Sequence, residues 1–102
     1  MFAVIYRFRV TKGKEDDFLS SWKELTGMLI QYEGGLGSRL HKTKEPGEYI
    51  AYARWPDRSM WAQQPKLNLP PEAETARNVM RNACVEISTL FELEIVEDLL
   101  IK

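Results

Sequence analysis

The stretch that decides the fold is Tyr49-Ile-Ala-Tyr-Ala-Arg-Trp-Pro-Asp-Arg-Ser-Met-Trp61. Aromatic and small apolar residues predict a β-strand up to Trp55, and Pro56 ends it because proline has no N–H to donate to a sheet. Asp57 can then cap a helix, since its carboxylate accepts hydrogen bonds from the free N–H groups of the first turn. The stretch therefore predicts a strand that runs directly into a capped helix.

One face of this predicted strand has an uneven surface. Tyr49, Ala51, Ala53 and Trp55 share that face, because successive side chains of a strand point to opposite sides of the sheet. Two alanines between a tyrosine and a tryptophan leave a low spot there. The low spot is either a hollow for a ligand or a place where a covering helix packs closer to the sheet.

The rest of the chain alternates between strand patterns and helical patterns. Residues 2–10 alternate apolar side chains with others, as in a strand, and residues 15–32 repeat apolar side chains at helical spacing. Turn residues at 44–47 predict a hairpin between two strands. We expect strands at about 2–10, 36–43, 49–55 and 85–96, and helices at about 15–32, 58–64 and 72–84.

The order of these elements is β-α-β-β-α-β, which predicts a ferredoxin-like α+β fold with an antiparallel sheet. Right-handed crossovers place the first strand at the centre, beside the third and the fourth. The helices are then expected to cover one face of the sheet. The side chains expected to meet in the core are Phe18, Trp22, Leu25, Leu29 and Tyr32 of the long helix and Tyr6, Leu40, Trp55 and Phe91 of the sheet.

The opposite face of the predicted sheet combines apolar and charged side chains. Arginines on three strands lie beside glutamates on the fourth, which indicates paired charges in a buried interface more than a solvated surface. We therefore expect a homodimer in which two such sheets pack face to face. The charged and polar residues of this predicted interface are Arg7, Arg9, Arg39, His41, Tyr52, Arg54, Glu92 and Glu94.

Length and composition limit the class of protein. The 102 residues suit one domain, which we place at residues 1–102, and the formal net charge of −1 gives no reason to expect a nucleic-acid or membrane partner. No apolar run approaches the roughly 20 residues of a membrane span. The single cysteine, Cys84, excludes an internal disulfide, so we expect a cytoplasmic location.

Three segments carry a resemblance to a known family: the turn Val10-Thr-Lys-Gly-Lys-Glu15, the helix stop Glu33-Gly-Gly35 and the corner Tyr52-Ala-Arg-Trp-Pro-Asp-Arg-Ser-Met-Trp61. Together with the order of elements, they resemble the antibiotic biosynthesis monooxygenase-like family. The resemblance covers essentially the whole chain and implies a dimeric α+β barrel. The family contains cofactor-free oxygenases of polycyclic phenols, haem-degrading enzymes and a quinol oxygenase type.

The resemblance allows haem degradation to be tested residue by residue. When the Thr-Lys-Gly turn and Trp55 are matched, the family's first-strand asparagine falls on Tyr6 and its short-helix tryptophan falls on Gln64. The haem-ligating histidine falls near Glu74. All three are replaced, and the lone His41 lies on a different strand. The resemblance therefore disfavours haem degradation.

For a cofactor-free oxygenase, the resemblance implies a cavity between sheet and helices that holds a small aromatic or quinol-type molecule without metal or flavin. Tyr6 is the candidate to hydrogen-bond a substrate oxygen and Trp55 to stack on a ring, so these two are the candidate catalytic residues. No general base is evident on that face. The candidate substrate-binding residues are Trp22, Ser38, Leu40, Ala51, Ala53, Trp61 and Met80.

Several of these residues also have a purely structural interpretation. Trp22 at helical spacing is more often a core residue than a ligand platform, and Trp55 and Trp61 can simply fix the Pro-Asp corner. A metal site is not predicted, because His41 has no cysteine or clustered carboxylate at ligand spacing. The proline-rich segment 65–71 is either an entrance to the cavity or a solvated linker. The competing hypothesis is a non-enzymatic ligand-binding or structural homodimer of the same fold.

Overall fold

The computed structural model describes residues 1–63 and 69–101 of the chain. Within these residues, none of the helices has the length and apolarity that a membrane crossing requires. The elements, in chain order, are β1 (Phe2–Val10), α1 (Glu15–Glu33), β2 (Ser38–Lys42), β3 (Glu48–Trp55), α2 (Arg58–Gln63), α3 (Pro71–Asn82) and β4 (Cys84–Glu94).

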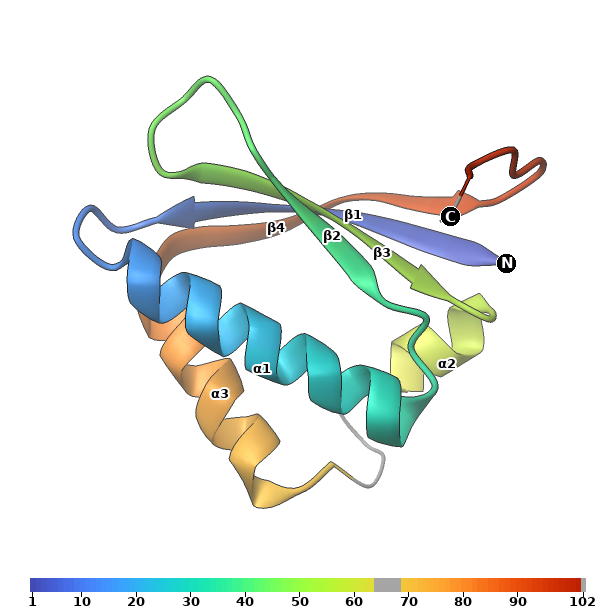
Figure 1. Cartoon of the computed structure of the whole chain (residues 1–102), viewed down its shortest axis with the longest axis horizontal. Helices are drawn as coiled ribbons and strands as arrows, with labels where there is room; N and C mark the ends of the chain where they lie inside the picture. The colour runs from blue at the N-terminus through green and yellow to red at the C-terminus, as the bar shows by residue number, and fades with distance from the viewer. Residues whose placement is uncertain (64–68, 102) are drawn as a thin grey trace.

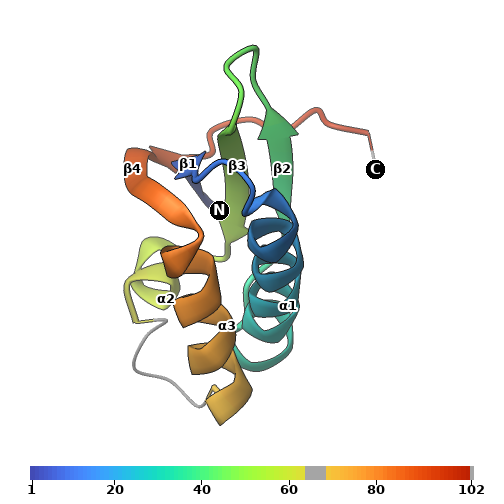
Figure 2. The ribbon, with the colours of Figure 1, turned by 90° about the vertical axis from the view of Figure 1, so that its left-hand side faces the viewer.

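The four strands of the described chain form one antiparallel sheet in the order β2-β3-β1-β4. Figure 1 shows α1 and α3 beside each other under one face of this sheet, with α2 at one end. The turned view in Figure 2 shows the same layer of helices below the strands. The arrangement confirms the predicted ferredoxin-like α+β fold, with β1 at the centre between β3 and β4.

A cluster of aromatic rings fixes α1 to the two central strands. The Phe18 side chain is fully buried, and its ring centroid lies 5.0 Å from that of Phe8 and 5.1 Å from that of Tyr49. Tilted ring pairs at such distances add stabilisation beyond the burial of their area. Because Phe8 and Tyr49 are paired in register across β1 and β3, one helix residue holds both strands.

The end of α1 differs from the prediction in which side chain turns inward. Glu33 lies four residues after Leu29 and therefore on the inward side, where it is only 2% exposed. Tyr32 was predicted to face inward but is 47% exposed, so that prediction is wrong. Gly34 stops the helix at a φ of +76°, and the N–H of Gly35 donates to the carbonyl of Leu29 at 3.1 Å.

A β-bulge in β4 changes which of its side chains face the helices. Ile5 pairs with Phe91 whereas Tyr6 pairs with Thr89, so β4 contains one extra residue, Leu90, at this point. Paired residues share a face of the sheet. Phe91 therefore lies on the open face, the face turned away from α1 and α3, and it is 59% exposed. The prediction that Phe91 faces the core is wrong.

The same bulge moves two glutamates that were predicted to lie on the open face. Glu92 pairs with Val4 and Glu94 pairs with Phe2, and both apolar partners are buried on the helix side. The prediction for Glu92 and Glu94 is wrong, because one extra residue reverses the alternation of every residue beyond it. The other predicted residues do share the open face by register: Arg7, Arg9, Arg39, His41, Tyr52 and Arg54.

The segment after β4 crosses part of the open face. Asp98 of this segment lies 3.0 Å from Arg54 of β3, so the segment passes over β1 (Figure 2). Elsewhere on the open face, the carboxylate of Glu86 lies 3.1 Å from Arg7 and 3.5 Å from Arg9. Glu86 therefore supplies the negative charge that was expected from Glu92 and Glu94. The crossing segment leaves four apolar side chains largely exposed: Val96, Leu99, Leu100 and Ile101.

We predict opposite effects for two glycine substitutions in and after α1. Gly27→Ala is expected to raise the free energy of unfolding by about 0.5–1 kcal/mol, because alanine suits a helix and its Cβ meets nothing within 4 Å. Gly34→Ala is expected to lower it by about 1–2 kcal/mol, because alanine is strained at a φ of +76° and its Cβ meets the Met60 side chain. Urea denaturation checks both, and two shifts of the same sign would contradict the argument.

Candidate functional site

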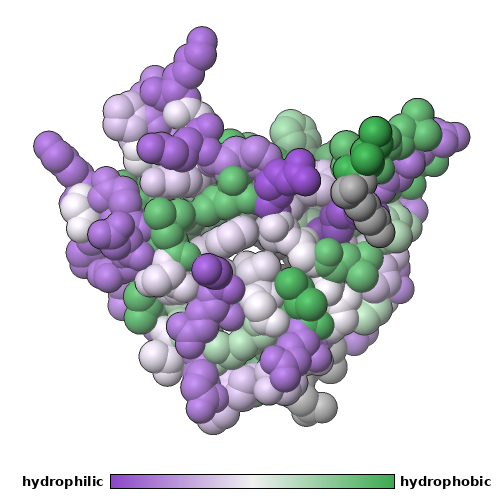
Figure 3. Space-filling view, viewed as in Figure 1, coloured by the Kyte–Doolittle hydropathy of each residue, from purple (hydrophilic) through white to green (hydrophobic). Residues whose placement is uncertain are grey.

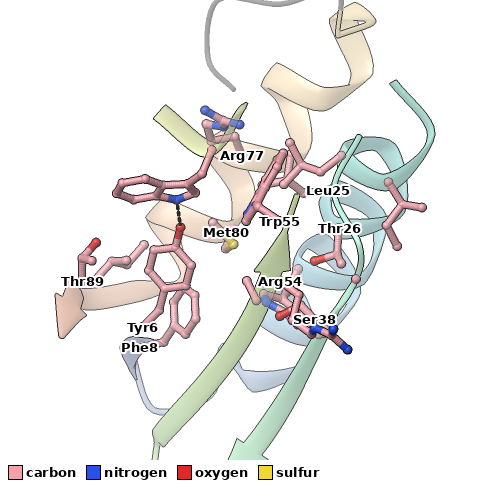
Figure 4. A pocket seen from close by; sticks show the side chains of 18 of the residues that line it. Tyr6, Phe8, Leu25, Thr26, Ser38, Arg54, Trp55, Arg77, Met80 and Thr89 are labelled. Carbon is pink, nitrogen blue, oxygen red and sulfur yellow. Dashed lines mark hydrogen bonds between the residues drawn. The ribbon is translucent and has the colours of Figure 1, made fainter. Parts of the chain in front are cut away.

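A cavity of about 480 Å³ lies between the sheet and the helices. Figure 3 shows the surface hollowed between the sheet and α1, and Figure 4 shows the side chains that line the cavity. The structure brings seven of the nine predicted site residues together in this wall. They are Tyr6, Trp22, Ser38, Ala53, Trp55, Trp61 and Met80.

Leu40 and Ala51 were also predicted to line the cavity, but the structure places them elsewhere. Ala51 is 1% exposed inside the core cluster that contains Phe18, and Leu40 packs against the same cluster. Both residues lie on the predicted face of the sheet, where they pair with each other across β2 and β3. Phe18 and its neighbours fill this end of the sheet, so only the Ala53 part of the predicted low spot is open.

One hydrogen bond joins two walls of the cavity. Nε1 of Trp61, in α2, donates to the hydroxyl oxygen of Tyr6, in β1, at 2.6 Å (Figure 4). Both rings also line the cavity. The bond therefore fixes an indole and a phenol in one arrangement against the same space.

The helix that carries Trp61 begins at the Asp57 cap that the sequence predicts. Oδ1 of Asp57 accepts hydrogen bonds from the N–H of Met60 at 2.9 Å and from the hydroxyl of Ser59 at 2.7 Å. These two bonds hold the pKa of the Asp57 carboxyl below its usual value. The corner after Trp55 thus sets where α2 begins and, through α2, where the Trp61 indole lies.

The Trp61 indole is also held on its other sides. The Phe2 ring lies 5.6 Å away between centroids, and the guanidinium carbon of Arg58 lies 5.7 Å from the centre of the indole. Arg58 in turn donates to Glu92 at 2.7 Å, so a glutamate that the bulge turns to the helix side steadies this corner. Trp61 supports the fold and forms a cavity wall at once.

Trp55 and Trp22 form further aromatic walls. Trp55 ends β3, is 3% exposed and packs against Phe2 in the core. Gly35 lies beside its ring, where a Cβ would come within 3.5 Å of the indole. Trp22 of α1 is half-buried and packs against the cluster around Phe18. Both tryptophans are core residues that present part of their surface to the cavity.

The basic side of the cavity was not predicted from the sequence. Arg77 and Arg81 of α3 both line it, one helical turn apart. Arg77 lies three residues before the predicted Met80, and Arg81 lies one residue after it. This spacing is the sequence signal that places both arginines near Met80 on the helix. The remaining unpredicted residues of the wall are Phe8, Leu25, Thr26, Leu29, Ile30, Gly35, Gly37, Arg54, Ile87 and Thr89.

The described wall of the cavity contains no acidic residue, histidine or cysteine. His41 lies on the open face, where its Nδ1 is 2.9 Å from the carbonyl oxygen of Ile50. Burial raises the pKa of the Cys84 thiol to about 11, so this thiol stays protonated at neutral pH. Across residues 1–63 and 69–101, no three His, Cys, Asp or Glu side chains come together as a metal site.

The three positions that bear on haem degradation have different places in the structure. Tyr6 is in the cavity wall and Glu74 is exposed on α3. Gln64 lies outside the described residues, as does most of the loop that was predicted as an entrance or a linker. Neither interpretation of that loop is therefore tested.

Glu33 is a buried carboxyl group within electrostatic reach of Arg77. It is 2% exposed, and among the described residues neither of its oxygens has a hydrogen-bond partner. Burial raises the pKa of Glu33, and the positive charge of Arg77 offsets this only in part. The ionised form of Glu33 is therefore disfavoured in the folded protein.

The sequence pattern that defines the antibiotic biosynthesis monooxygenase family matches residues 1–64, from β1 to α2. The chain belongs to the antibiotic biosynthesis monooxygenase family. The match includes Tyr6, Trp55 and Trp61 of the cavity wall but ends before α3, so it does not extend to the two arginines. No curated protein matches the chain.

Solved structures share the fold of this family member. A mutant of SnoaB, a cofactor-independent oxygenase from Streptomyces nogalater, has a TM-score of 0.75 at 15% identity, over 96% of this chain and 95% of that one. Rv0793 from Mycobacterium tuberculosis has a TM-score of 0.74 at 14% identity, over 96% and 97%. A further antibiotic biosynthesis monooxygenase has a TM-score of 0.74 at 17% identity, over 95% and 100%. At these identities the likeness shows the fold alone.

We predict that Glu33→Gln stabilises the protein more at neutral pH than in mild acid. Because the pKa is raised in the folded state, the penalty for the buried carboxylate is absent below the ordinary value of 4.5 and complete above the folded-state pKa. The variant should match the wild type in free energy of unfolding near pH 4 and exceed it near pH 7. Urea denaturation at both pH values measures this.

The control for this comparison is Glu24→Gln, which removes the same charge at an exposed position of the same helix. It should change the free energy of unfolding little at either pH. A difference between wild type and Glu33→Gln that is equal at both pH values would show that the charge of Glu33 is not the cause.

Proposed function

We propose that this protein is a cofactor-independent, monooxygenase-like protein that binds and oxidises a small aromatic or quinol-type molecule in the cavity. The observation that carries the proposal is the wall of Trp22, Trp55 and Trp61 with Tyr6 around about 480 Å³. Ligand cavities commonly measure about 300–1,000 Å³ and combine apolar walls with a few polar groups. Family membership and the fold shared with the oxygenase SnoaB support the same function.

In the proposed reaction, molecular oxygen reacts directly with the bound ring. An ionised phenol or hydroquinone is rich in electrons, so it passes one electron to O₂, and the two radicals combine as a peroxide on a ring carbon. The peroxide takes up one proton from solvent, and that carbon then loses its remaining hydrogen as a proton while the O–O bond breaks. One oxygen atom remains as a ring carbonyl, and the other leaves as water.

The residues of the wall have separate roles in this reaction. Trp55 and Trp61 hold the ring, and Tyr6, fixed by Trp61, presents its hydroxyl to a ligand oxygen. The charge of Arg77 favours the ionised ligand, because a nearby cation lowers the pKa of a phenol. This effect takes the place of a general base, since the described wall holds no carboxylate or imidazole that would act as one.

The alternative function is that of a non-enzymatic ligand-binding or structural homodimer. The same missing general base favours this alternative, because an enzyme that ionises its substrate ordinarily contains a group to receive the proton. The largely buried Trp55 favours it as well, since that indole already serves the core.

We also propose that two copies of the protein pack through their open faces. This face carries the exposed apolar Phe91 and Leu93 beside the pair of Arg7 with Glu86, and the C-terminal segment adds further exposed apolar side chains. A second copy offers the same combination, so apolar groups are covered and charges stay paired. Cys84, a free thiol and the only cysteine of the chain, supports a cytoplasmic location for this dimer.

Oxygen uptake by the purified protein tests the enzymatic proposal. We expect protein-dependent uptake with at least one member of a panel of anthrones, naphthols and hydroquinones, with quinone absorbance rising in parallel. Tyr6→Phe is expected to lower the rate about 10-fold, the effect of losing roughly 1.4 kcal/mol of hydrogen bonding in the transition state. Tyr32→Phe, at an exposed position, is the control and should keep the wild-type rate. No uptake above the uncatalysed rate would favour the non-enzymatic alternative.

Sedimentation velocity at micromolar concentration tests the dimer. The wild type should sediment as a dimer, and Phe91→Glu should sediment as a monomer because it places a carboxylate in the apolar part of the interface. Leu19→Glu makes the same change on the exposed surface of α1 and should remain dimeric. A monomeric wild type, or a dimer that tolerates Phe91→Glu, would refute this interface.

A further inference from the structure

The two sides of the cavity differ in their chemistry. Thr26 of α1 and Ser38 of β2 contribute hydroxyl groups on the side where β2 forms the edge of the sheet. Arg77 of α3 and Thr89 of β4, the opposite edge strand, line the other side (Figure 4). Arg81, one turn after Arg77 on α3, lines the cavity as well. A ligand that spans the cavity meets hydroxyl groups at one end and two guanidinium groups at the other.

Unlike most of the other arginines, these two have no carboxylate within ion-pair distance among the described residues, and the one carboxyl within electrostatic reach of Arg77 is the buried Glu33, whose ionised form is disfavoured. Four arginines elsewhere have a carboxylate partner at 2.7–3.5 Å: Arg7, Arg9, Arg54 and Arg58. Among the described residues, the side chains of Arg77 and Arg81 have no ion-pair partner, and no acidic side chain lines the cavity with them. Since the net charge of the whole chain is −1, this positive charge is a local property of the cavity.

We propose that the ligand of this cavity is an aromatic carboxylate, whose carboxylate binds Arg77 and Arg81 while its ring lies among the tryptophans. This inference rests on the proposed binding of a flat aromatic molecule and specifies its chemical class. The guanidinium group presents two parallel N–H donors, which match the two oxygens of a carboxylate.

A carboxylate suits this side of the cavity better than a phenol alone. A phenol of ordinary acidity titrates near pH 10, so it is neutral at physiological pH, whereas a carboxylate carries its charge throughout that range. Hydrogen bonds between ionised partners are roughly twice as strong as those between neutral ones. Two guanidinium groups that line the cavity without an ion-pair partner among the described residues, Arg77 half-buried and Arg81 more exposed, therefore favour the ligand that brings a permanent negative charge.

Two matched probes test this proposal by binding alone. 2-Naphthoate carries the carboxylate, and 2-naphthamide has nearly the same shape without the charge. Both are titrated under nitrogen and followed by quenching of the cavity tryptophans and by calorimetry. We expect 2-naphthoate to bind at least 10-fold more tightly near pH 7, and the preference to fall below threefold in the Arg77→Gln, Arg81→Gln double variant. The control double variant Lys12→Gln, Lys23→Gln removes two exposed charges and should keep the preference.

Three results would overturn the carboxylate assignment: equal affinity for the two probes, no binding of either, or a preference that survives the double arginine variant. If circular dichroism shows that the double variant is unfolded, the single variants decide, and each is expected to reduce the preference at least threefold. Oxygen uptake separates the two proposals. Uptake of oxygen with neutral anthrones but no carboxylate preference overturns only this inference, whereas a preference without any uptake overturns only the oxygenase activity.

Discussion

The hydrogen bond from Trp61 to Tyr6 connects the central strand of the sheet to the short helix at its end, and the cavity depends on it. Tyr6 is fixed by β1, which is paired on both sides. Trp61 is fixed by α2, which begins directly after Trp55 because Pro56 ends the strand and Asp57 caps the helix. The chain therefore leaves the sheet at Trp55, and the side chain of the next tryptophan, Trp61, contacts the sheet again at Tyr6. The space left between these two indoles and α1 is the cavity.

Much of this arrangement follows from local patterns in the sequence. Alternation in β1, the apolar spacing of α1 and the Pro-Asp corner predict the order of elements and hence the ferredoxin-like fold, as well as the Asp57 cap. The cavity residues were predicted from the face of a strand, and faces are set by alternation alone. Leu40 and Ala51 show the limit of that argument. Their face was predicted correctly, but whether a small residue leaves a hollow depends on the large ring that packs above it, here that of Phe18.

The remaining errors come from interactions between distant parts of the chain. The sequence of β4 alternates like a regular strand both before and after Leu90. Only the pairing with β1 shows that the strand has an extra residue there. Because the prediction did not include this extra residue, it assigned Phe91, Glu92 and Glu94 to the wrong faces of the sheet. Arg77 and Arg81 were missed for another reason. The inward face of α3 was predicted from its few apolar residues, and two basic residues at helical spacing look like an ordinary solvated surface until the sheet opposite them is known.

Strand β3 separates the cavity from the open face, and its two sets of side chains are interleaved along one short segment. Ala53 and Trp55 belong to the cavity wall and Tyr52 to the open face, while Arg54 pairs with Asp98 on the open face and also contributes to the cavity wall. In evolution, these two surfaces can therefore change one substitution at a time, except at Arg54, which contributes to both. The length of the strand has no such freedom, because a one-residue insertion or deletion would exchange the two sets of side chains. Natural relatives of this protein should vary in the identity of the β3 residues far more than in their number.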